Sequence, residues 1–568
     1  MSGLAIQERS VAQASGLPCR VSRPGITPGR RPGAARRSRA PRRLSLPALF
    51  LFAVTAFAQV TTEDLLRDRD NPADWLSYNG DYAGWRYSGL SEITPENVAD
   101  LRVRWVFQRQ MNQAFETTPL VHEGVMYLTV PPNEVFAVDA ASGVGLWHYR
   151  RELPPKIIAC CGEVNRGLAV HGDRLFMATL DAHVIALDRK TGRVLWDAEM
   201  IDYTLSYSGT HAPLVVNDKV LVGVAGAEYG IRGFIDAYNI DDGSRAWRFY
   251  TVPGPGEFGH DTWEGESWKT GGGSIWITPS YDPDANLVYF GTGNPSPDWN
   301  GDVRKGDNLF TDAVVALDPD TGERKWHFQF TPHDVHDWDA TQTMILVAKE
   351  VDGEPRKLLL TANRNGFYYV LDRLTGEFLH GSEFVKQTWA KGLDEAGRPM
   401  RIPGREPTEE GNQVYPMVAG GTNWMSPAYS PLTDLFYVTV REGSSVYYKG
   451  PAEYQPGARF WGSMFINEQV QGEWYGAIRA LEPLTGELVW EHRLFQPAWA
   501  GLLATAGGLV FAGEQDGYFK ALDAKTGAER WRLNVGGVVR ASPMAFESKG
   551  RQFVAIAAGQ ALFVFGLP

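Results

Sequence analysis

The chain has 568 residues, with 55 Lys and Arg against 67 Asp and Glu, and a formal net charge of −12 at pH 7. An apolar share of 43% with 12% aromatic residues can bury a large core, which excludes a wholly disordered chain. Ten of the arginines and one acidic residue fall in residues 1–43, so the remainder is strongly acidic. Such a surface repels phosphate backbones, and we expect no nucleic-acid binding.

Residues 1–58 have the features of an export signal. An Arg-rich stretch ending at Arg43 leads into the uncharged run LSLPALFLFAVTAFA, which closes on Ala56-Phe57-Ala58. A positive flank, a short apolar centre and small residues at the end are typical of a cleaved signal peptide. The run is shorter than the ~20 residues of a membrane-spanning helix. We therefore expect an Arg-rich leader and signal peptide over 1–58, a mature chain beginning near Gln59, no membrane span and a periplasmic protein.

Two other interpretations of this leader remain open. The start codon could be assigned too far upstream, or Arg42-Arg43 could belong to a twin-arginine export address. Both still lead to export, so neither changes the expected compartment.

A repeat runs through residues 59–568. Each copy is a short apolar strand, a turn resembling Asp-x-x-Thr-Gly, and a Trp a few residues later; the copies end at Trp147, Trp196, Trp247, Trp326, Trp490 and Trp531. A degenerate copy carries Leu379 at the Trp position, and LRVRW, ending at Trp105, is the second half of another. The Asp caps a tight turn and the Gly takes a positive φ, as in a β-hairpin.

The spacing of these copies predicts the fold. Most intervals are close to the ~40–50 residues of a four-stranded propeller blade, and the longest gap has room for another blade around Ser426–Val440. We predict an all-β, eight-bladed β-propeller with tryptophan-docking repeats, a single domain over 59–568 with little helix. Strands after Gln59 should close the ring by pairing with the final apolar segments.

The first departure from the repeat is the adjacent pair Cys160-Cys161. In an exported protein adjacent cysteines should oxidise. A bond between neighbours closes a small, strained ring, which suits a rigid surface for a flat ligand. Buried thiols, or thiols that link two chains, are the alternatives.

Three further departures lie in Gly-rich loops. Glu228 in GAEYG and Asn294 in GTGNP lie among small residues, where backbone can approach a ligand closely. Trp276 follows a Gly-rich loop and stands outside the repeated Trp position. A solvent-facing turn glutamate, a capping asparagine and one more packing tryptophan are the alternative interpretations.

Residues 331–342, TPHDVHDWDATQ, concentrate two histidines and three aspartates. The spacing resembles a zinc site, but no Cys or His-Glu-x-x-His partner follows, so we expect four of the five to form turns and hydrogen bonds and one carboxylate to act as a base. Arg364 follows in a strand-end turn, NRNG. Because Glu228, Asn294 and Asp339 offer hard oxygen donors, and buried carboxylates repel unless a cation separates them, we expect Ca²⁺.

Together these segments resemble a known family. From about Trp75 to Phe565 the chain resembles the quinoprotein alcohol dehydrogenases of the methanol and ethanol dehydrogenase type, which use pyrroloquinoline quinone. The matching motifs, in order, are Cys160-Cys161 with VNRG, GAEYGIRG, GGGSIW, GTGNPSPDWNGDVRKGDN, TPHDVHDWDA, NRNG and AWAGLLATAGGLVFAGEQDGYFKALD.

The resemblance implies a role for each candidate residue. Cys160-Cys161 would form a disulfide on one face of the quinone, with Trp276 stacked on the other. Asp339 would be the catalytic base and Arg364 the partner of the reactive carbonyls, while Glu228, Asn294 and Asp339 would hold the metal. The remaining residues that would hold the cofactor are Glu116, Arg166, Thr210, Ala227, Asn423 and Trp499.

The implied reaction is oxidation of a small alcohol to an aldehyde by hydride transfer to pyrroloquinoline quinone, assisted by Ca²⁺. Lanthanide-using relatives carry an extra Asp two residues after the base, where this chain has Thr341, so we expect Ca²⁺. Ala225 stands where some relatives have Ser, which puts one cofactor hydrogen bond in doubt.

Electron transfer should need a separate partner. No Cys-x-x-Cys-His occurs and the chain ends at Pro568, soon after the last strands, so we expect no attached haem and a separate acceptor such as cytochrome c. A homodimer is left open. The alternatives are a non-enzymatic propeller scaffold of the outer-membrane assembly type, and a dehydrogenase with the same cofactor that acts on polyols, polymeric alcohols or aldehydes.

Overall fold

A computed structural model of the chain describes residues 59–111, 113, 115–469 and 472–568, so the predicted leader lies outside it. The described part is almost entirely β-sheet, as predicted. Its α-helix is α1 (Thr62–Leu66), and the short 3₁₀ turns are Asp68–Asp70, Val98–Asp100, Tyr203–Leu205, Ala227–Tyr229, His260–Thr262, Ser267–Thr270 and Gly301–Val303. Among the described residues no helix has the length and apolar character to cross a membrane.

Five sheets of four strands follow one another from the first part of the chain to its middle, each built from consecutive strands. Their strands are β3 (Leu120–His122), β4 (Val125–Val130), β5 (Glu134–Asp139) and β6 (Gly145–Arg150); β7 (Ala169–His171), β8 (Arg174–Ala178), β9 (His183–Asp188) and β10 (Val194–Glu199); β11 (Leu214–Val216), β12 (Lys219–Gly223), β13 (Phe234–Asn239) and β14 (Arg245–Tyr250); β15 (Ser280–Asp282), β16 (Leu287–Gly291), β17 (Ala313–Leu317) and β18 (Arg324–Gln329); β19 (Ile345–Val351), β20 (Glu354–Ala362), β21 (Phe367–Asp372) and β22 (Phe378–Glu383).

Two more sheets follow, one of four strands and one of five, and the first fills the long gap in the repeat around Ser426–Val440, as predicted. It contains β26 (Ala428–Ser430), β27 (Leu435–Glu442), β30 (Tyr475–Leu481) and β31 (Leu488–Leu494). The next contains β32 (Leu502–Thr505), β33 (Leu509–Gly513), β34 (Tyr518–Asp523) and β35 (Glu529–Asn534), with β1 (Tyr87–Ser88) added parallel to β32.

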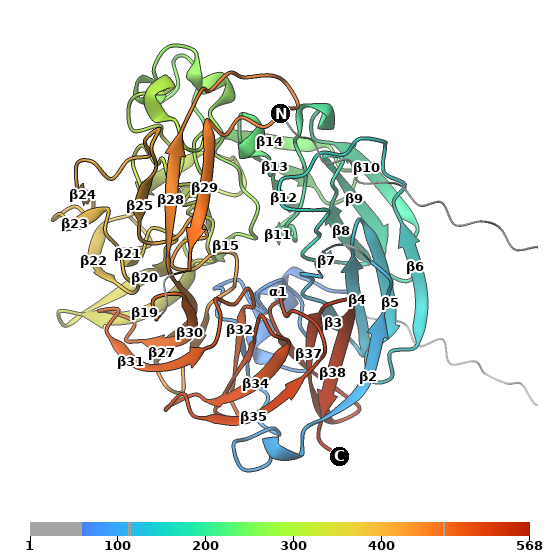
Figure 1. The fold of residues 1–568 in the computed structure, drawn as a ribbon. Helices are drawn as coiled ribbons and strands as arrows, with labels where there is room; N and C mark the ends of the chain where they lie inside the picture. The colour runs from blue at the N-terminus through green and yellow to red at the C-terminus, as the bar shows by residue number, and fades with distance from the viewer. Residues whose placement is uncertain (1–58, 112, 114, 470–471) are drawn as a thin grey trace, which may run out of the picture. The chain divides into compact units, whose positions relative to one another are not determined.

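The last sheet joins the two ends of the described chain. β36 (Met544–Ser548), β37 (Arg551–Ala558) and β38 (Ala561–Gly566) pair in order, and the early strand β2 (Arg102–Gln108) lies antiparallel to β38. This pairing confirms the predicted closure. The sheets therefore succeed one another around a common centre, which is the architecture of a β-propeller (Figure 1).

Five strands lie outside these sheets, in the long insertion between β22 and β30. β23 (Ala390–Leu393) pairs with β24 (Pro399–Arg401), and a three-stranded sheet contains β25 (Asn412–Val414), β28 (Ser444–Lys449) and β29 (Ser463–Glu468). The loop between β28 and β29 returns to the main sheets, where the Phe460 N–H donates to the Glu228 carbonyl oxygen at 2.7 Å. The insertion thus reaches the loops in which the candidate residues lie.

Tryptophan docking joins consecutive sheets, as the repeat predicts. The Trp326 indole N–H on β18 donates to the Arg373 carbonyl oxygen, at 3.1 Å, in the turn of the next sheet. Gly376 of that turn has φ +78°, and a Cβ there would lie 2.6 Å from the Trp326 ring, so the turn requires glycine. The same indole-to-turn bond, at 2.9–3.1 Å, is made by Trp105, Trp147, Trp196, Trp247 and Trp490.

In the degenerate copy of the repeat, a different side chain makes the hydrogen bond to the turn of the next sheet. Leu379 stands at the Trp position, but the Tyr368 hydroxyl, from the third strand of that sheet, donates to the Pro483 carbonyl oxygen at 2.9 Å. A Cβ on Gly486 of that turn would lie 2.7 Å from the Tyr368 ring. The turn itself is unchanged, so only the docking group has moved from the fourth strand to the third.

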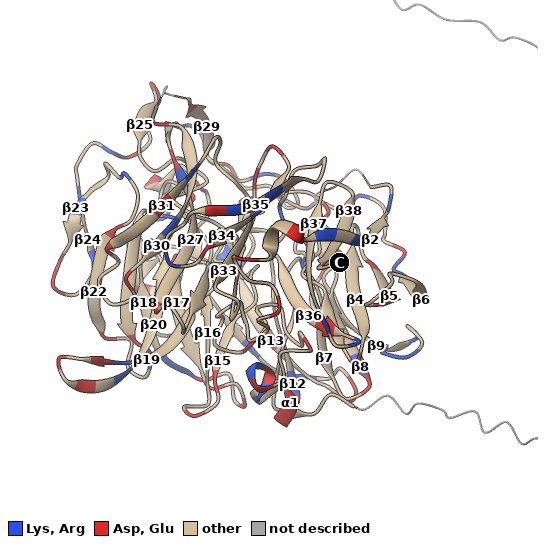
Figure 2. Ribbon diagram, turned by 90° about the horizontal axis from the view of Figure 1, so that it is seen from below, with Lys and Arg blue, Asp and Glu red and all other residues tan. Residues whose placement is uncertain are grey.

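The first and fourth strands of each sheet differ in burial. The first strands, such as β3 and β11, are fully buried, while fourth strands such as β6 alternate between exposed and half-buried residues. Central strands such as β16 and β17 are free of charge, and most charged residues lie in loops and outer strands (Figure 2). Strands do bury some charges, such as Asp236 on β13 and Arg479 on β30, each of which is paired with an oppositely charged side chain.

Candidate active site

The candidate residues come from loops of different sheets that open at the same rim. Trp276 precedes the first strand of its sheet, β15, and Asn294 follows the second, β16. Because β15 and β16 are antiparallel, the start of one and the end of the other lie at the same edge. Thr210, Glu228, Asp339, Arg364, Asn423 and Trp499 occupy equivalent places in other sheets, so the ring brings them to one rim.

These loops enclose a cavity of about 340 Å³. Predicted residues from well-separated parts of the sequence line it together: Cys160, Cys161, Arg166, Thr210, Glu228, Trp276, Asp339, Arg364, Asn423 and Trp499. The arrangement of sheets thus collects ten of the thirteen candidate residues in one chamber.

Cys160 and Cys161 form a disulfide in the cavity wall. Their sulfur atoms and a Glu228 carboxylate oxygen lie within 4.8 Å of one another. Trp276 lines the same cavity, with the Arg166 guanidinium 5.2 Å from its ring centre. The cavity therefore has one wall of bonded sulfur and another of indole, which suits a flat molecule.

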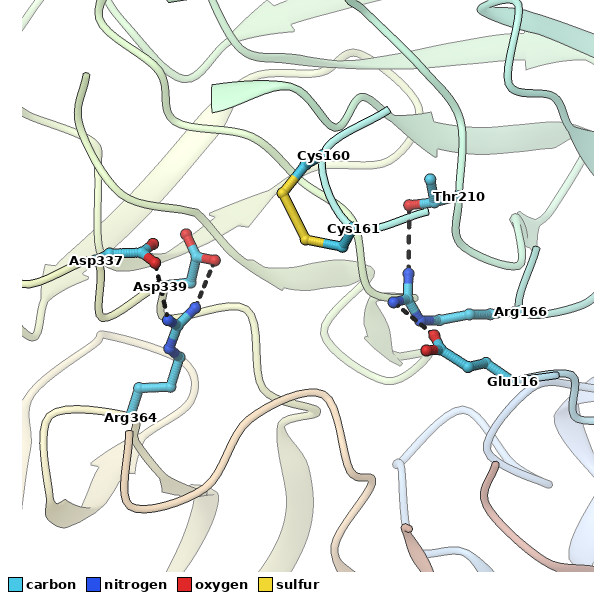
Figure 3. Close-up of a disulfide and its surroundings, with 8 residues drawn as sticks. All are labelled: Glu116, Cys160, Cys161, Arg166, Thr210, Asp337, Asp339 and Arg364. Atoms are coloured by element: carbon cyan, nitrogen blue, oxygen red, sulfur yellow. Dashed lines mark hydrogen bonds and ion pairs between the residues drawn. A yellow bond between two sulfur atoms is a disulfide. The ribbon is translucent and has the colours of Figure 1, made fainter. Parts of the chain in front are cut away.

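Arg166 is the centre of a buried polar cluster. It forms an ion pair with Glu116, 2.8 Å between Nη2 and Oε2, and donates to the Thr210 hydroxyl at 3.3 Å. Figure 3 shows this cluster on one side of the disulfide and a second cluster, around Arg364, on the other. Because Glu116 and Thr210 fix the guanidinium, Arg166 is ready to bind an anionic group.

Arg364 is held between two carboxylates. Its Nη1 lies 2.8 Å from Asp339 Oδ2 and its Nη2 3.4 Å from Asp337 Oδ2 (Figure 3). The other oxygen of Asp339 accepts the backbone N–H of Asn294 at 2.5 Å. The Asn294 side-chain oxygen is buried and has no hydrogen-bond partner. A buried oxygen without a partner, on a residue whose backbone holds a carboxylate, is a group that a cation would satisfy.

Burial perturbs the acids of the cavity. Loss of water, followed by the nearby charge of Asp339, raises the pKa of Glu228 to about 7. Burial also raises the pKa of Asp339, although the Arg364 charge works in the opposite direction. Several carboxylates that resist ionisation side by side need additional positive charge, so the electrostatics also favour a cation.

Three predicted residues do not line the cavity. Glu116 acts on it through Arg166, and Asn294 through its backbone bond to Asp339. Ala227 is fully buried behind the wall, where its carbonyl oxygen accepts the Ser296 hydroxyl, while Ala225 and Gly226 face the cavity.

The structure also adds lining residues that sequence reasoning missed. Trp424 stacks on Trp499, with ring centres 4.3 Å apart and planes 8° from parallel. Asp298 also lines the cavity; it lies in the matching motif GTGNPSPDWN, but the sequence analysis assigns it no role. Trp299, Arg459, Trp461 and Phe465 complete this side, the last three from the insertion.

The histidines of residues 331–342 have structural roles, as predicted. His333 Nδ1 donates to the Gly306 carbonyl oxygen at 2.8 Å, and His336 stacks on Trp338 and donates to the Arg405 carbonyl oxygen. Asp334 likewise accepts two backbone N–H groups. Asp337 differs from the prediction, because it faces the cavity and pairs with Arg364.

Comparison with known proteins identifies the family of the chain. Residues 75–388 and 475–554 match the family described as the glucose/ethanol/alcohol dehydrogenase β-propeller domain, which uses pyrroloquinoline quinone. The chain is 41% identical to the quinoprotein alcohol dehydrogenase PedH of Pseudomonas putida, over 92% of this chain and 93% of that protein. It is 38% identical to a lanthanide-dependent methanol dehydrogenase of Methylacidiphilum fumariolicum, over 88% and 86%.

A solved structure of a europium-containing methanol dehydrogenase superimposes with a TM-score of 0.85 at 36% identity, covering 89% of this chain and all of that one. The fold and the family match together define a β-propeller of the class that binds pyrroloquinoline quinone. More narrowly, the chain belongs to the quinoprotein alcohol dehydrogenases of the methanol and ethanol dehydrogenase type. Membership of an enzyme family favours the dehydrogenase over the non-enzymatic scaffold.

Proposed function

We propose that this protein oxidises small alcohols to aldehydes, using pyrroloquinoline quinone and Ca²⁺, and passes the electrons to a separate carrier such as cytochrome c. The observation that carries the proposal is the buried pair of Asp339 and Arg364, 2.8 Å apart, in the cavity that the Cys160-Cys161 disulfide and Trp276 also line. When bound, the quinone supplies the hydride acceptor and the metal a Lewis acid beside it.

The residues of the cavity fit the quinone. The disulfide and Trp276 would hold its two faces, and Arg166, supported by Glu116 and Thr210, would bind its anionic groups. The Nε of Arg166 and the indole nitrogen of Trp424 are buried without hydrogen-bond partners, which is expected of donors that await a ligand. Asn423 and Trp499, which line the cavity, are the remaining residues that we assign to the cofactor. Ala227, which was also predicted to bind it, lies behind the cavity wall and is not assigned.

Glu228, Asn294 and Asp339 fit a hard divalent cation. All three offer oxygen. The Asn294 side-chain oxygen is buried without a hydrogen-bond partner, and the Asn294 backbone N–H orients the Asp339 carboxylate. Thr341, two residues after Asp339, is buried and offers no carboxylate to the metal, so we assign Ca²⁺. Purified protein that is active only with a lanthanide would contradict this choice.

In the reaction, Asp339 would take the hydroxyl proton of the alcohol. Its Oδ1 is held by the Asn294 N–H and its Oδ2 by Arg364, so the carboxylate is oriented before substrate binds. Arg364 is itself fixed by Asp337 and by the Val418 carbonyl oxygen, at 2.7 Å from Nη2. A fixed guanidinium can stabilise negative charge that develops nearby without reorganising.

We further assign the seven four-stranded sheets and the five-stranded sheet as eight blades of a single domain over residues 59–568. Residues 1–58 would be the leader and signal peptide, and the mature enzyme would be periplasmic. The sequence pattern supports both assignments, and N-terminal sequencing of exported protein would test the boundary at Gln59.

The decisive experiment is reconstitution. Purified protein is incubated with pyrroloquinoline quinone and either Ca²⁺ or a lanthanide, its absorption spectrum is recorded, and turnover is measured with an artificial electron acceptor and a panel of alcohols. We expect a quinone absorption band and alcohol-dependent turnover with Ca²⁺. Absence of the band with either metal would contradict the proposal.

A further inference from the structure

The stacked indoles of Trp424 and Trp499 form a part of the cavity wall that is covered from behind. Their ring centres are 4.3 Å apart, their planes are 8° from parallel, and both line the cavity. The Arg441 guanidinium lies 3.5 Å from the centre of the Trp499 ring. Since Trp424 covers one face of Trp499, a guanidinium this close must lie over the other face. Trp499 can therefore offer only its edge to a ligand.

Arg441 connects a strand to both loops that carry these indoles. It lies on β27 and is 4% exposed. Its backbone N–H donates to the Gly421 carbonyl oxygen at 2.8 Å, three residues before Trp424. Its Nη1 donates to the Ala498 carbonyl oxygen at 2.7 Å, one residue before Trp499. A single residue thus fixes the two loops relative to a buried strand.

The charge of Arg441 is not balanced by a neighbouring acid. In the described ranges of the chain no ion pair includes Arg441, and its Nε is buried without a hydrogen-bond partner. The adjacent acid, Glu442, pairs with Arg479. Burial, followed by the charges of Arg364 and Arg540, lowers the pKa of Arg441 to about 9, so the group stays charged at neutral pH. A buried cation whose charged neighbours are also cations is costly unless an anion lies near it.

A second guanidinium lies close to the same pair of indoles. Arg166 is 5.7 Å from the centre of the Trp424 ring. It lines the cavity and is paired with Glu116, whereas Arg441 does not line the cavity. One guanidinium therefore faces the ligand directly, and the other acts from behind Trp499. Cation–π attraction orders such a group of rings and cations, and the field of a buried charge is only weakly screened.

We propose that Arg441 is a positioning residue for the cofactor, which directs the edge of Trp499 at the quinone from behind the cavity wall and whose charge favours the bound anion. This inference rests on the proposed function, because it names a further residue on which quinone binding depends. Without the guanidinium, one face of Trp499 would lose its packing partner and the indole could turn away from the ligand. The anionic quinone would in turn stabilise the buried cation.

The first test measures the affinity of the apoprotein for pyrroloquinoline quinone by calorimetry in buffer with Ca²⁺. We expect Arg441→Met to raise Kd about tenfold, the size of a well-buried cation–π contact. Arg441→Lys keeps a charge at this place and should recover most of the affinity. The control is Arg493→Met, because Arg493 lies 3.6 Å from the Tyr475 ring centre but does not line the cavity. The control should bind the quinone as tightly as wild type.

A second measurement needs no cofactor. Stacked indoles couple their electronic transitions, so the difference between the circular dichroism spectra of wild-type apoprotein and Trp424→Phe should contain an exciton signal from this pair. Arg441→Met should lose much of that signal, because Trp499 is no longer held parallel to Trp424, whereas Arg493→Met should keep it. Urea denaturation of each variant establishes that it is folded. If Arg441→Met does not fold, Arg441→Gln, which keeps a donor for the Ala498 carbonyl oxygen, replaces it with the same expectations.

Four outcomes would overturn the inference. They are wild-type affinity for the quinone in Arg441→Met, an equal loss of affinity in Arg441→Lys, an equal loss in Arg493→Met, and an exciton signal that Arg441→Met leaves unchanged. Equal quinone binding by wild type and Arg441→Met would refute only the role of Arg441. Absence of a quinone band in the wild-type protein would refute the proposed function itself.

Discussion

The turns of the repeat and the loops of the cavity use the same residue types in opposite ways. In a turn, the Asp318 carboxylate accepts the backbone N–H groups of Asp320 and Thr321, at 2.9 Å and 3.3 Å, and so satisfies its own local chain. In the cavity, Asp339 is buried and reaches Arg364 from another sheet. The aspartates of the repeat stabilise the turns of the propeller, whereas those outside the repeat do not cap turns and can take part in the reaction.

The largest effect should follow loss of the cavity carboxylate. We expect Asp339→Asn to lower kcat by about 10³-fold, within the 10²–10⁴ range for removal of a general base, while a quinone absorption band is kept. The matched control is Asp318→Asn, because Asn239 already stands at the corresponding place in another copy of the repeat. Wild-type kcat in Asp339→Asn would contradict a catalytic role for the cavity aspartate. An equal loss in the control would show that the aspartates of the turns and of the cavity do not differ in function.

A docking tryptophan should show the reverse pattern. Trp326→Ala removes a buried indole and its bond to the Arg373 carbonyl oxygen, and should lower the free energy of unfolding by about 3–5 kcal/mol. Turnover per quinone-loaded molecule should stay unchanged, because Trp326 does not line the cavity. Urea denaturation and titrated activity measure the two effects. Trp268→Ala, a half-buried tryptophan outside the repeat, is the control and should cost clearly less.

A smaller effect should appear as pH dependence of stability near the cavity. His211 follows Thr210 and is fully buried; its Nδ1 donates to the Ala212 carbonyl oxygen and its Nε2 accepts the Gly223 N–H. Burial lowers the pKa of His211 to about 4. Below about pH 6.5 His211 is protonated in the unfolded chain but stays neutral in the folded chain. The free energy of unfolding therefore falls as the pH decreases from 6.5 to 4, by up to about 3 kcal/mol.

His211→Gln tests this, because an amide can both donate and accept at the same place but does not titrate near these pH values. Urea midpoints of wild type and variant are compared between pH 7 and 4.5. The variant should lose stability less steeply over this interval. An identical pH dependence in both proteins would show that His211 is not responsible.

Much of the fold could be predicted because the repeat is local. The Asp, Gly and Trp of one hairpin predict the turn, the strand pairing and the contact with the next sheet. Six indole-to-turn hydrogen bonds confirm the predicted contact between sheets. Tyr368 could not be foreseen, since it replaces a Trp of the fourth strand from a position on the third.

The candidate site was predictable only in part. Motifs that match a known family identify Arg166 and Asp339, whereas no pattern in the sequence assigns a role to Asp298. Its burial depends on how the loop folds against Asp337 and on the insertion that brings Trp461 over the cavity. Trp461 is more than a hundred positions from Asp298 in the sequence, and no pattern along the chain indicates that the two line the same cavity.

The pairing of β2 with β38 has a consequence for biogenesis. β2, at Arg102–Gln108, cannot pair with β38, at Ala561–Gly566, until nearly the whole polypeptide has been made. A chain cut short before Ala561 would leave the edge of β2 unpaired and the last sheet incomplete. Only a full-length chain can therefore close the propeller. A prematurely terminated product should be sensitive to proteolysis rather than accumulate as a partly assembled enzyme.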